Sequence, residues 1–119
     1  MRLSLVSIDK DGVVRVACQG NITCDDFRTE AKNPLETVLG ATWSNNRVIL
    51  DLDRTPYIDS SAIGWLIETS RKFKDAGGAL AVHSVRPAVR QVLELLKVGR
   101  IVSLAQTEIA ARQLIAGGN

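Results

Sequence analysis

The sequence predicts a single α/β domain with a mixed, mostly parallel β-sheet and about four α-helices, in the order β-β-α-β-α-β-α-β-α. Two observations lead to this prediction. The chain opens with two segments of alternating apolar and polar residues separated by a glycine-containing turn, which is typical of an antiparallel hairpin. Later, short apolar segments alternate with amphipathic segments of helical period, which is typical of parallel strands joined by crossover helices. We expect the domain to span residues 1–116 and residues 117–119 to form a frayed tail.

The leading hairpin is predicted over residues 2–8 and 13–19, where apolar residues recur with a period of two. The tetrapeptide before residue 13 contains Gly12, which can adopt the positive φ of a tight turn. Two short helical segments are expected next, at 24–31 and 34–39. Thr23 begins the first with capping-box spacing, and a proline suits the first position of the second.

A buried strand is predicted over 47–52, because this segment is almost continuously apolar and therefore suits a strand covered on both faces. A loop precedes it at 40–46. The following helix is expected at about 61–75, with its aliphatic side chains on one face toward the core. Gly77-Gly78 ends this helix, one glycine being free to adopt the left-handed conformation.

The last third of the chain continues the alternation of strand and helix. A strand is predicted at 79–83, and a helix follows from Pro87 to a stop at Gly99. A short strand is expected at 101–104. Thr107 then caps a final helix over 108–116.

Composition and charge exclude several classes of function. The net charge is +2 and no run of Lys and Arg occurs, so we expect no binding of nucleic acid. The first residues lack the apolar stretch of a signal peptide, and no apolar run approaches membrane-spanning length. We therefore expect a cytoplasmic protein without membrane contact. Cys18 and Cys24 have neither redox-motif nor zinc-ribbon spacing, and with one histidine the sequence predicts neither a metal site nor a cofactor.

The candidate functional segment is Asp59-Ser60-Ser61, which follows the buried strand 47–52 and precedes a helix. Ligands and partners of open α/β sheets bind outside the carboxyl ends of the strands. A helix N-terminus also presents unpaired N–H groups and the positive end of the helix dipole, which favour a phosphate. From their spacing alone, the same three residues could instead serve only as helix caps.

The segment Asp59-Ser60-Ser61-Ala62-Ile63-Gly64 resembles the signature of STAS domains, the family of bacterial anti-sigma factor antagonists, in which Asp-Ser-Ser/Thr-Gly-Leu-Gly follows an apolar strand. The segments 73–78 and 86–89 also fit the course of that family, and the resemblance covers essentially the whole chain. Ala62 departs from the usual glycine, and Thr23 stands where the family often has Asp.

The resemblance implies a STAS-like fold and a protein that is not an enzyme. It implies that Ser60 is phosphorylated by a serine kinase that is often also the anti-sigma factor, and that a serine phosphatase reverses the modification. The unmodified form would bind the kinase and free the sigma factor. We expect a monomer. The alternative is a STAS scaffolding subunit of a transport or stress-sensing complex without a phospho-switch.

Five residues are predicted to contact the partner. They are Asp59, Ser61, Ala62, Trp65 and Thr23. Asp59 could cap the helix, or it could orient the Ser60 hydroxyl or bind basic groups of the kinase. Trp65 lies opposite the core-facing side of the predicted helix, where it would be either packed under the loop 53–58 or an exposed anchor for the partner.

His83 is the only histidine and is the residue on which an enzymatic interpretation would depend. A Ser60-His83-Asp59 set can be written, but adjacent residues point in different directions and no G-x-S-x-G elbow is present. We therefore expect His83 to cap the end of a strand, and we predict no catalytic residues.

Overall fold

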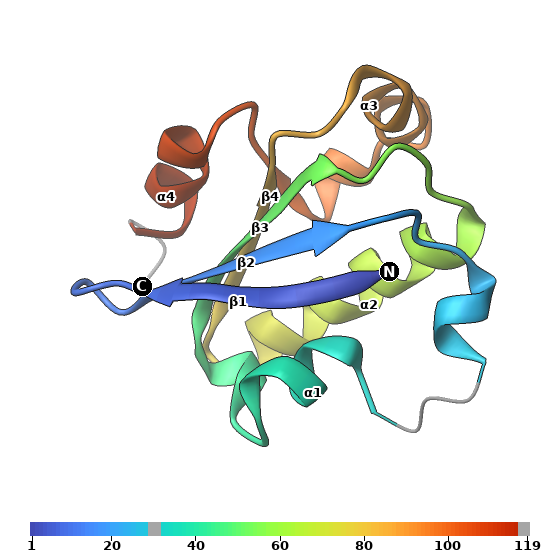
Figure 1. Ribbon diagram of the computed structural model, residues 1–119. Helices are drawn as coiled ribbons and strands as arrows, with labels where there is room; N and C mark the ends of the chain where they lie inside the picture. Colours follow the sequence, from blue (N-terminus) through green and yellow to red (C-terminus); the bar gives the residue numbers. More distant parts are fainter. Residues whose placement is uncertain (29–31, 117–119) are drawn as a thin grey trace.

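The computed structural model describes residues 1–28 and 32–116, and within them strands and helices follow the predicted order (Figure 1). The last part of the helix expected at 24–31 and the tail expected at 117–119 lie outside the described residues. The strands are β1 (Arg2–Ile8), β2 (Val13–Gln19), β3 (Arg47–Arg54), β4 (Ala79–His83) and β5 (Ser103–Leu104). The helices are α1 (Pro34–Leu39), α2 (Ser60–Asp75), α3 (Pro87–Leu95) and α4 (Glu108–Ala116), with 3₁₀ turns η1 (Cys24–Phe27), η2 (Trp43–Asn45) and η3 (Val98–Arg100).

The five strands form one mixed sheet in the order β1-β2-β3-β4-β5. β1 is antiparallel to β2, and the remaining pairs are parallel. The predicted hairpin and the predicted mixed, mostly parallel sheet are therefore confirmed. Each parallel neighbour is reached through a helix-containing connection, as parallel pairing requires.

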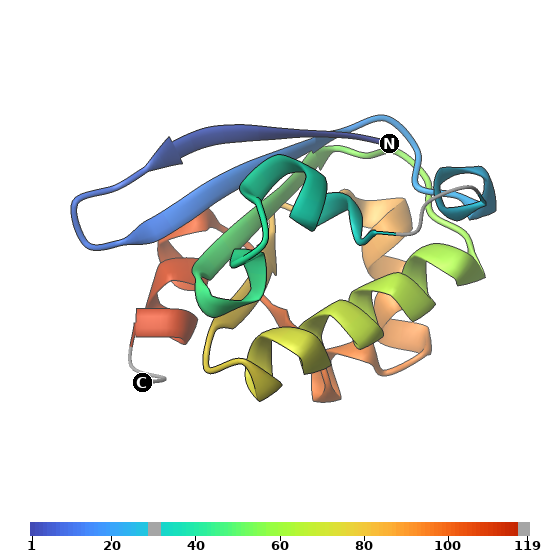
Figure 2. The same ribbon diagram turned by 90° about the horizontal axis from the view of Figure 1, so that it is seen from below.

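Side chains of the central strands alternate between two hydrophobic clusters, one on each face of the sheet. Val48, Leu50 and Leu52 of β3 belong to the larger cluster, which includes residues of α1, α2 and α3. Ile49 faces the other side, where it packs with Ala111 and Ile115 of α4. Figure 2 shows α1 and α2 on one side of the strands. β3 is covered on both faces, which is why its sequence is almost continuously apolar.

Several boundaries differ from those predicted. The segment after Thr23 is a 3₁₀ turn over Cys24–Phe27, and α2 begins one residue earlier than expected, at Ser60. α3 ends at Leu95, not at Gly99, because Lys97 adopts a left-handed conformation with φ of 55°. The loop expected at 40–46 contains η2, whose Trp43 is buried in an edge-to-face contact with Phe73, 5.3 Å between ring centroids.

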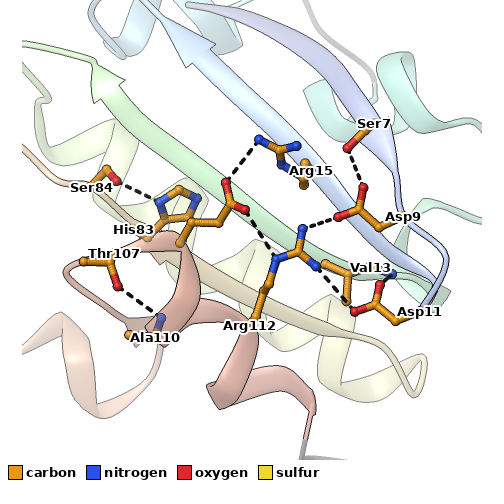
Figure 3. A network of polar contacts seen from close by, with 11 residues as sticks. Ser7, Asp9, Asp11, Val13, Arg15, His83, Ser84, Thr107, Ala110 and Arg112 are labelled. Carbon is orange, nitrogen blue, oxygen red and sulfur yellow. Dashed lines mark hydrogen bonds and ion pairs between the residues drawn. The ribbon is translucent and has the colours of Figure 1, made fainter.

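A network of charged side chains ties α4 to the tip of the β1–β2 hairpin (Figure 3). The Arg112 guanidinium binds the carboxylate of Asp9 and lies 3.4 Å from that of Asp11. Glu108 pairs with Arg112 at 3.4 Å and with Arg15 of β2 at 3.2 Å. Hydrogen bonds from Arg112 and then Ser7 hold the pKa of Asp9 below its ordinary value. These contacts fix α4 against one face of the sheet.

Candidate functional site

Asp59 joins the beginnings of two helical elements that are far apart in the sequence. One carboxylate oxygen, Oδ1, accepts a hydrogen bond from the N–H of Ala62 at 3.1 Å and so caps α2. The other oxygen, Oδ2, accepts from the N–H of Cys24 in η1 at 2.9 Å. Both oxygens are therefore engaged in backbone hydrogen bonds, which satisfy N–H groups that a helix start leaves unpaired. Of the roles expected for Asp59, helix capping is the one that these hydrogen bonds show.

The backbone before η1 runs beside the loop that leads into α2. Ile22 forms a parallel bridge with Ile58, and its N–H donates to the carbonyl oxygen of Tyr57 at 3.1 Å. The N–H of Asp59 in turn donates to the carbonyl oxygen of Ile22 at 3.2 Å. Figure 2 shows the resulting neighbourhood of η1 and the first turn of α2. Thr23 is thereby held close to Asp59, although the two are far apart in the chain.

The hydroxyl-bearing residues at the start of α2 differ in accessibility. Ser60 is exposed, Ser61 is half-buried, and the Ala62 side chain is completely buried in the larger core cluster. Ser60 occupies the first helical position, directly after the Asp59 cap. Ser60 is therefore available at the surface, whereas Thr23 is half-buried like Ser61. The expected contact between a partner and Ala62 does not fit the burial of that side chain.

Trp65 is buried, with 7% of its surface exposed, so the exposed-anchor interpretation is wrong. Its Nε1–H donates to Asn33 Oδ1 at 3.2 Å, and its ring lies 5.8 Å from that of Phe27. The packed alternative is the observed one, but the covering segments are η1 and the start of α1 and not the loop 53–58. These segments shield a helix face that a helical wheel of α2 assigns to solvent.

Tyr57 is a surface residue of this site that the sequence analysis did not single out. Its side chain is 55% exposed, three residues before Ser60. Exposed tyrosines are enriched among residues that dominate protein interfaces, because they bury a large apolar ring and also offer a hydroxyl. The sequence signal that could have identified Tyr57 is an aromatic residue in the short loop directly before a helix cap. Tyr57 extends the candidate surface along the loop that enters α2.

His83 is the last residue of β4 and is buried, 3% exposed. Its Nδ1 lies 2.9 Å from the Ser84 hydroxyl (Figure 3), and burial lowers its pKa, with opposing contributions from Asp51 and Glu108. Asp59 is hydrogen-bonded to backbone N–H groups and His83 to Ser84, and within residues 1–28 and 32–116 no hydrogen bond links Ser60, His83 and Asp59 to one another. The described parts of the chain contain no group of three His, Cys, Asp or Glu side chains arranged to hold a metal ion. None of their helices is both long enough and apolar enough to cross a membrane.

Replacing Asp59 by alanine is expected to lower the free energy of unfolding by about 1–3 kcal/mol, because it removes two hydrogen bonds to a charged acceptor. Chemical denaturation monitored by tryptophan fluorescence measures this change. Asp59→Asn is the matched control, since its single carbonyl oxygen can cap α2 but cannot accept both bonds. The free energy of unfolding of Asp59→Asn should therefore lie between those of Asp59→Ala and the wild type. A free energy of unfolding for Asp59→Ala equal to that of the wild type would contradict the capping role.

The chain matches the family model described as STAS domain over residues 7–111. Among solved structures it is similar to TM1081 of Thermotoga maritima, described as an anti-sigma factor antagonist, with 21% identity, 92% of each chain covered and a TM-score of 0.75. It is also similar to the anti-sigma factor antagonist SpoIIAA in its unphosphorylated form, with 19% identity, 99% of this chain and 98% of that chain covered, and a TM-score of 0.62.

Two further structures share the fold. The phosphorylated form of SpoIIAA from Bacillus aligns at 18% identity over 95% of this chain and 97% of that chain, with a TM-score of 0.56. A sulfate transporter family protein from Wolinella succinogenes aligns at 16% identity over 87% of each chain, with a TM-score of 0.64. At these identities the structural likeness concerns the fold alone, whereas the family model spans most of the sequence. The chain therefore belongs to the STAS domain family.

Proposed function

We propose that this protein is a phosphorylation-switched anti-sigma factor antagonist, cytoplasmic and non-enzymatic. It binds an anti-sigma factor with serine kinase activity while Ser60 is unmodified, and it releases this partner when Ser60 is phosphorylated. The observation that carries the proposal is the exposed position of Ser60 at the start of α2, beside a capping residue whose carboxylate is already engaged. A kinase can reach this hydroxyl without unfolding the cap.

Phosphorylation of Ser60 would act locally. A phosphoserine adds about −1.5 to −2 charge and three acceptor oxygens, and the first turn of a helix accommodates that charge through its free N–H groups and dipole. The fold should therefore persist while the charge and bulk of the exposed surface change. The similarity of this chain to SpoIIAA in both the unphosphorylated and the phosphorylated form supports a switch that leaves the fold in place.

The partner-binding surface is proposed to combine the start of α2 with the segments beside it. Ser60, Ser61 and Thr23 supply polar groups there, and Tyr57 supplies an exposed ring. A phosphate at Ser60 would lie inside such an interface, where an unpaired charge must lose its hydration. This penalty is the physical basis for release, and a serine phosphatase would restore binding by removing the group.

The proposal is tested by intact-mass and phosphopeptide analysis of the protein purified from its native host. We expect a species heavier by one phosphate that maps to Ser60 and disappears in Ser60→Ala. Ser61→Ala is the matched control and should retain the modification, because Ser61 is half-buried. Modification that persists in Ser60→Ala, or its absence under every growth condition, would contradict the phospho-switch.

A second candidate function is a STAS scaffolding subunit without a phospho-switch. This function is supported by the similarity of the chain to a sulfate transporter family protein, which has the same fold. In that case Ser60 serves only as the first residue of α2, and substitutions at Ser60 should leave every interaction of the protein unchanged.

A further inference from the structure

The outer edge of the sheet at β1 has no neighbouring strand within residues 1–28 and 32–116. Figure 1 shows β1 as the outermost strand, with β2 on its only paired side. Monomeric proteins usually protect such an edge with charged residues, proline, β-bulges or a very short strand. β1 is seven residues long, and of these protections it has Arg2 at its first position and a register shift between Leu5 and Ser7. Its positions 3–8 include neither proline nor a charged side chain. The backbone N–H and C=O groups along this edge are therefore open to another strand.

The apolar side chains of β1 are unusually exposed for a strand of this length. Leu5, Val6 and Ile8 are 44%, 52% and 67% exposed. The hydrophobic core accounts for Leu3, which packs against the larger cluster, but it does not account for the other three. A strand that supplied both backbone pairing and apolar side chains would cover this edge.

The sequence of the edge is chemically self-complementary when two copies run antiparallel. When the eight residues Arg-Leu-Ser-Leu-Val-Ser-Ile-Asp at positions 2–9 are aligned with the same segment in reverse, each residue meets one of complementary chemistry. Arg2 of one copy falls opposite Asp9 of the other, and Leu3 falls opposite Ile8. Ser4 falls opposite Ser7, and Leu5 opposite Val6. Opposite charges therefore meet at the ends of the ladder, and apolar and hydroxyl side chains meet inside it.

The β-bulge in β1 makes this register possible. In β1–β2 pairing, Leu3 is opposite Cys18, Leu5 opposite Val16 and Ile8 opposite Val14, and the register shifts between Leu5 and Ser7. Directly opposite residues of an antiparallel pair point to the same face, so Leu3, Leu5 and Ile8 share the face of the larger core. Without the extra residue, Ile8 would lie on the other face. With it, Leu3 of one copy and Ile8 of the other lie on the same side of a joint sheet.

We propose that the occupant of this edge is a second copy of the chain, paired antiparallel through β1 about a two-fold axis between Leu5 and Val6. The two sheets then continue into each other, and each copy contributes Arg2 and Asp9 to the two ends of the ladder. Asp9 lies just beyond the end of β1 and already binds Arg112 of its own chain, so Arg2 of the other copy would be a second cation for its carboxylate. This charge complementarity sets the register, because shifting the copies by two residues removes both charge pairs. The contact is short, so the dimer forms in a concentration-dependent manner. This association differs from the monomer expected from the sequence, and it uses a surface that does not include Ser60.

Sedimentation velocity of the purified, unphosphorylated full chain over about a hundredfold range of concentration tests the association. We expect a monomer–dimer equilibrium whose dissociation constant rises at least about tenfold in Val6→Lys. This substitution places a charge in both Leu5–Val6 pairs at the centre of the ladder. Ile109→Lys in α4 is the matched control, since Ile109 is also an exposed aliphatic, 71% exposed, and it should leave the equilibrium unchanged. A monomer at every concentration would overturn the proposal, and so would a dimer that survives Val6→Lys.

Disulfide capture tests the register itself. Two variants, Ser4→Cys and Ser7→Cys, are each made with Cys24→Ser, so that the exposed native thiol is removed. When the two variants are mixed and oxidised with copper phenanthroline, a linked heterodimer is expected. Each variant alone should crosslink poorly, because like positions are about 10 Å apart in this register. Equal crosslinking of the single variants and the mixture would overturn the proposed pairing. Neither experiment needs the kinase, so failure here is independent of the proposed phospho-switch.

Discussion

Ser60→Asp is expected to weaken binding of the anti-sigma partner by about a hundredfold or more. The aspartate places a fixed negative charge at the first position of α2, where the proposed interface excludes water, and an unpaired buried charge costs several kcal/mol. Titration calorimetry with the partner captured by the Ser60→Ala form measures the affinity. Ser60→Asn is the matched control, because it has nearly the same shape without the charge, and it should bind far more tightly than Ser60→Asp.

The same substitution should not reduce stability, and this separates a surface effect from a folding defect. An acidic residue in the first turn of a helix interacts favourably with the helix dipole. The melting temperature of Ser60→Asp should therefore equal or slightly exceed that of the wild type, as measured by circular dichroism. An affinity of Ser60→Asp for the partner equal to that of the wild type would contradict the phospho-switch and favour the scaffolding function.

Gly78→Ala is expected to destabilise the fold by about 3 kcal/mol, because the added methyl group has no space. A Cβ at this position would lie 2.2 Å from the carbonyl oxygen of Ser44 and 2.4 Å from that of Asn46. Both atoms belong to backbone, and Asn46 also accepts a hydrogen bond from the N–H of Ala79 at 3.1 Å. The loop before β3 would have to move away from the start of β4. Urea denaturation gives the change in free energy.

Two other glycines provide graded controls for this substitution. Gly77→Ala is expected to cost about 1 kcal/mol, since Gly77 has a φ of +84° but no atom within 4 Å of an added Cβ. Gly64 lies inside α2 with open space around it, so Gly64→Ala should stabilise the protein by up to about 1 kcal/mol. A neutral Gly78→Ala beside these controls would show that the close approach of the two loops does not matter for stability.

The sequence predicted the site best where a local rule applied. The Asp59 cap depends on the neighbouring first turn of α2, and Asp59 is indeed the residue that accepts from Ala62. The predicted Thr23 start with its capping-box partner Asp26 is also local, and the Thr23 N–H donates to Asp26 at 2.8 Å. For Trp65 the sequence left a packed and an exposed alternative open and did not identify the covering segments, because its partners come from another part of the chain. A helical wheel describes α2 alone and cannot include η1, which covers it.

What the sequence determined by itself is therefore the order of elements, the hairpin, the buried character of β3 and the helix start at Asp59. These follow from side-chain periodicity and from backbone preferences of a few adjacent residues, such as Gly77 at a positive φ. Only the tertiary structure decided the burial of Trp65 by Asn33 and the approach of η1 to Asp59. These contacts join residues 32 and 35 positions apart. Their formation depends on how whole elements pack against the sheet, and no local pattern encodes that geometry.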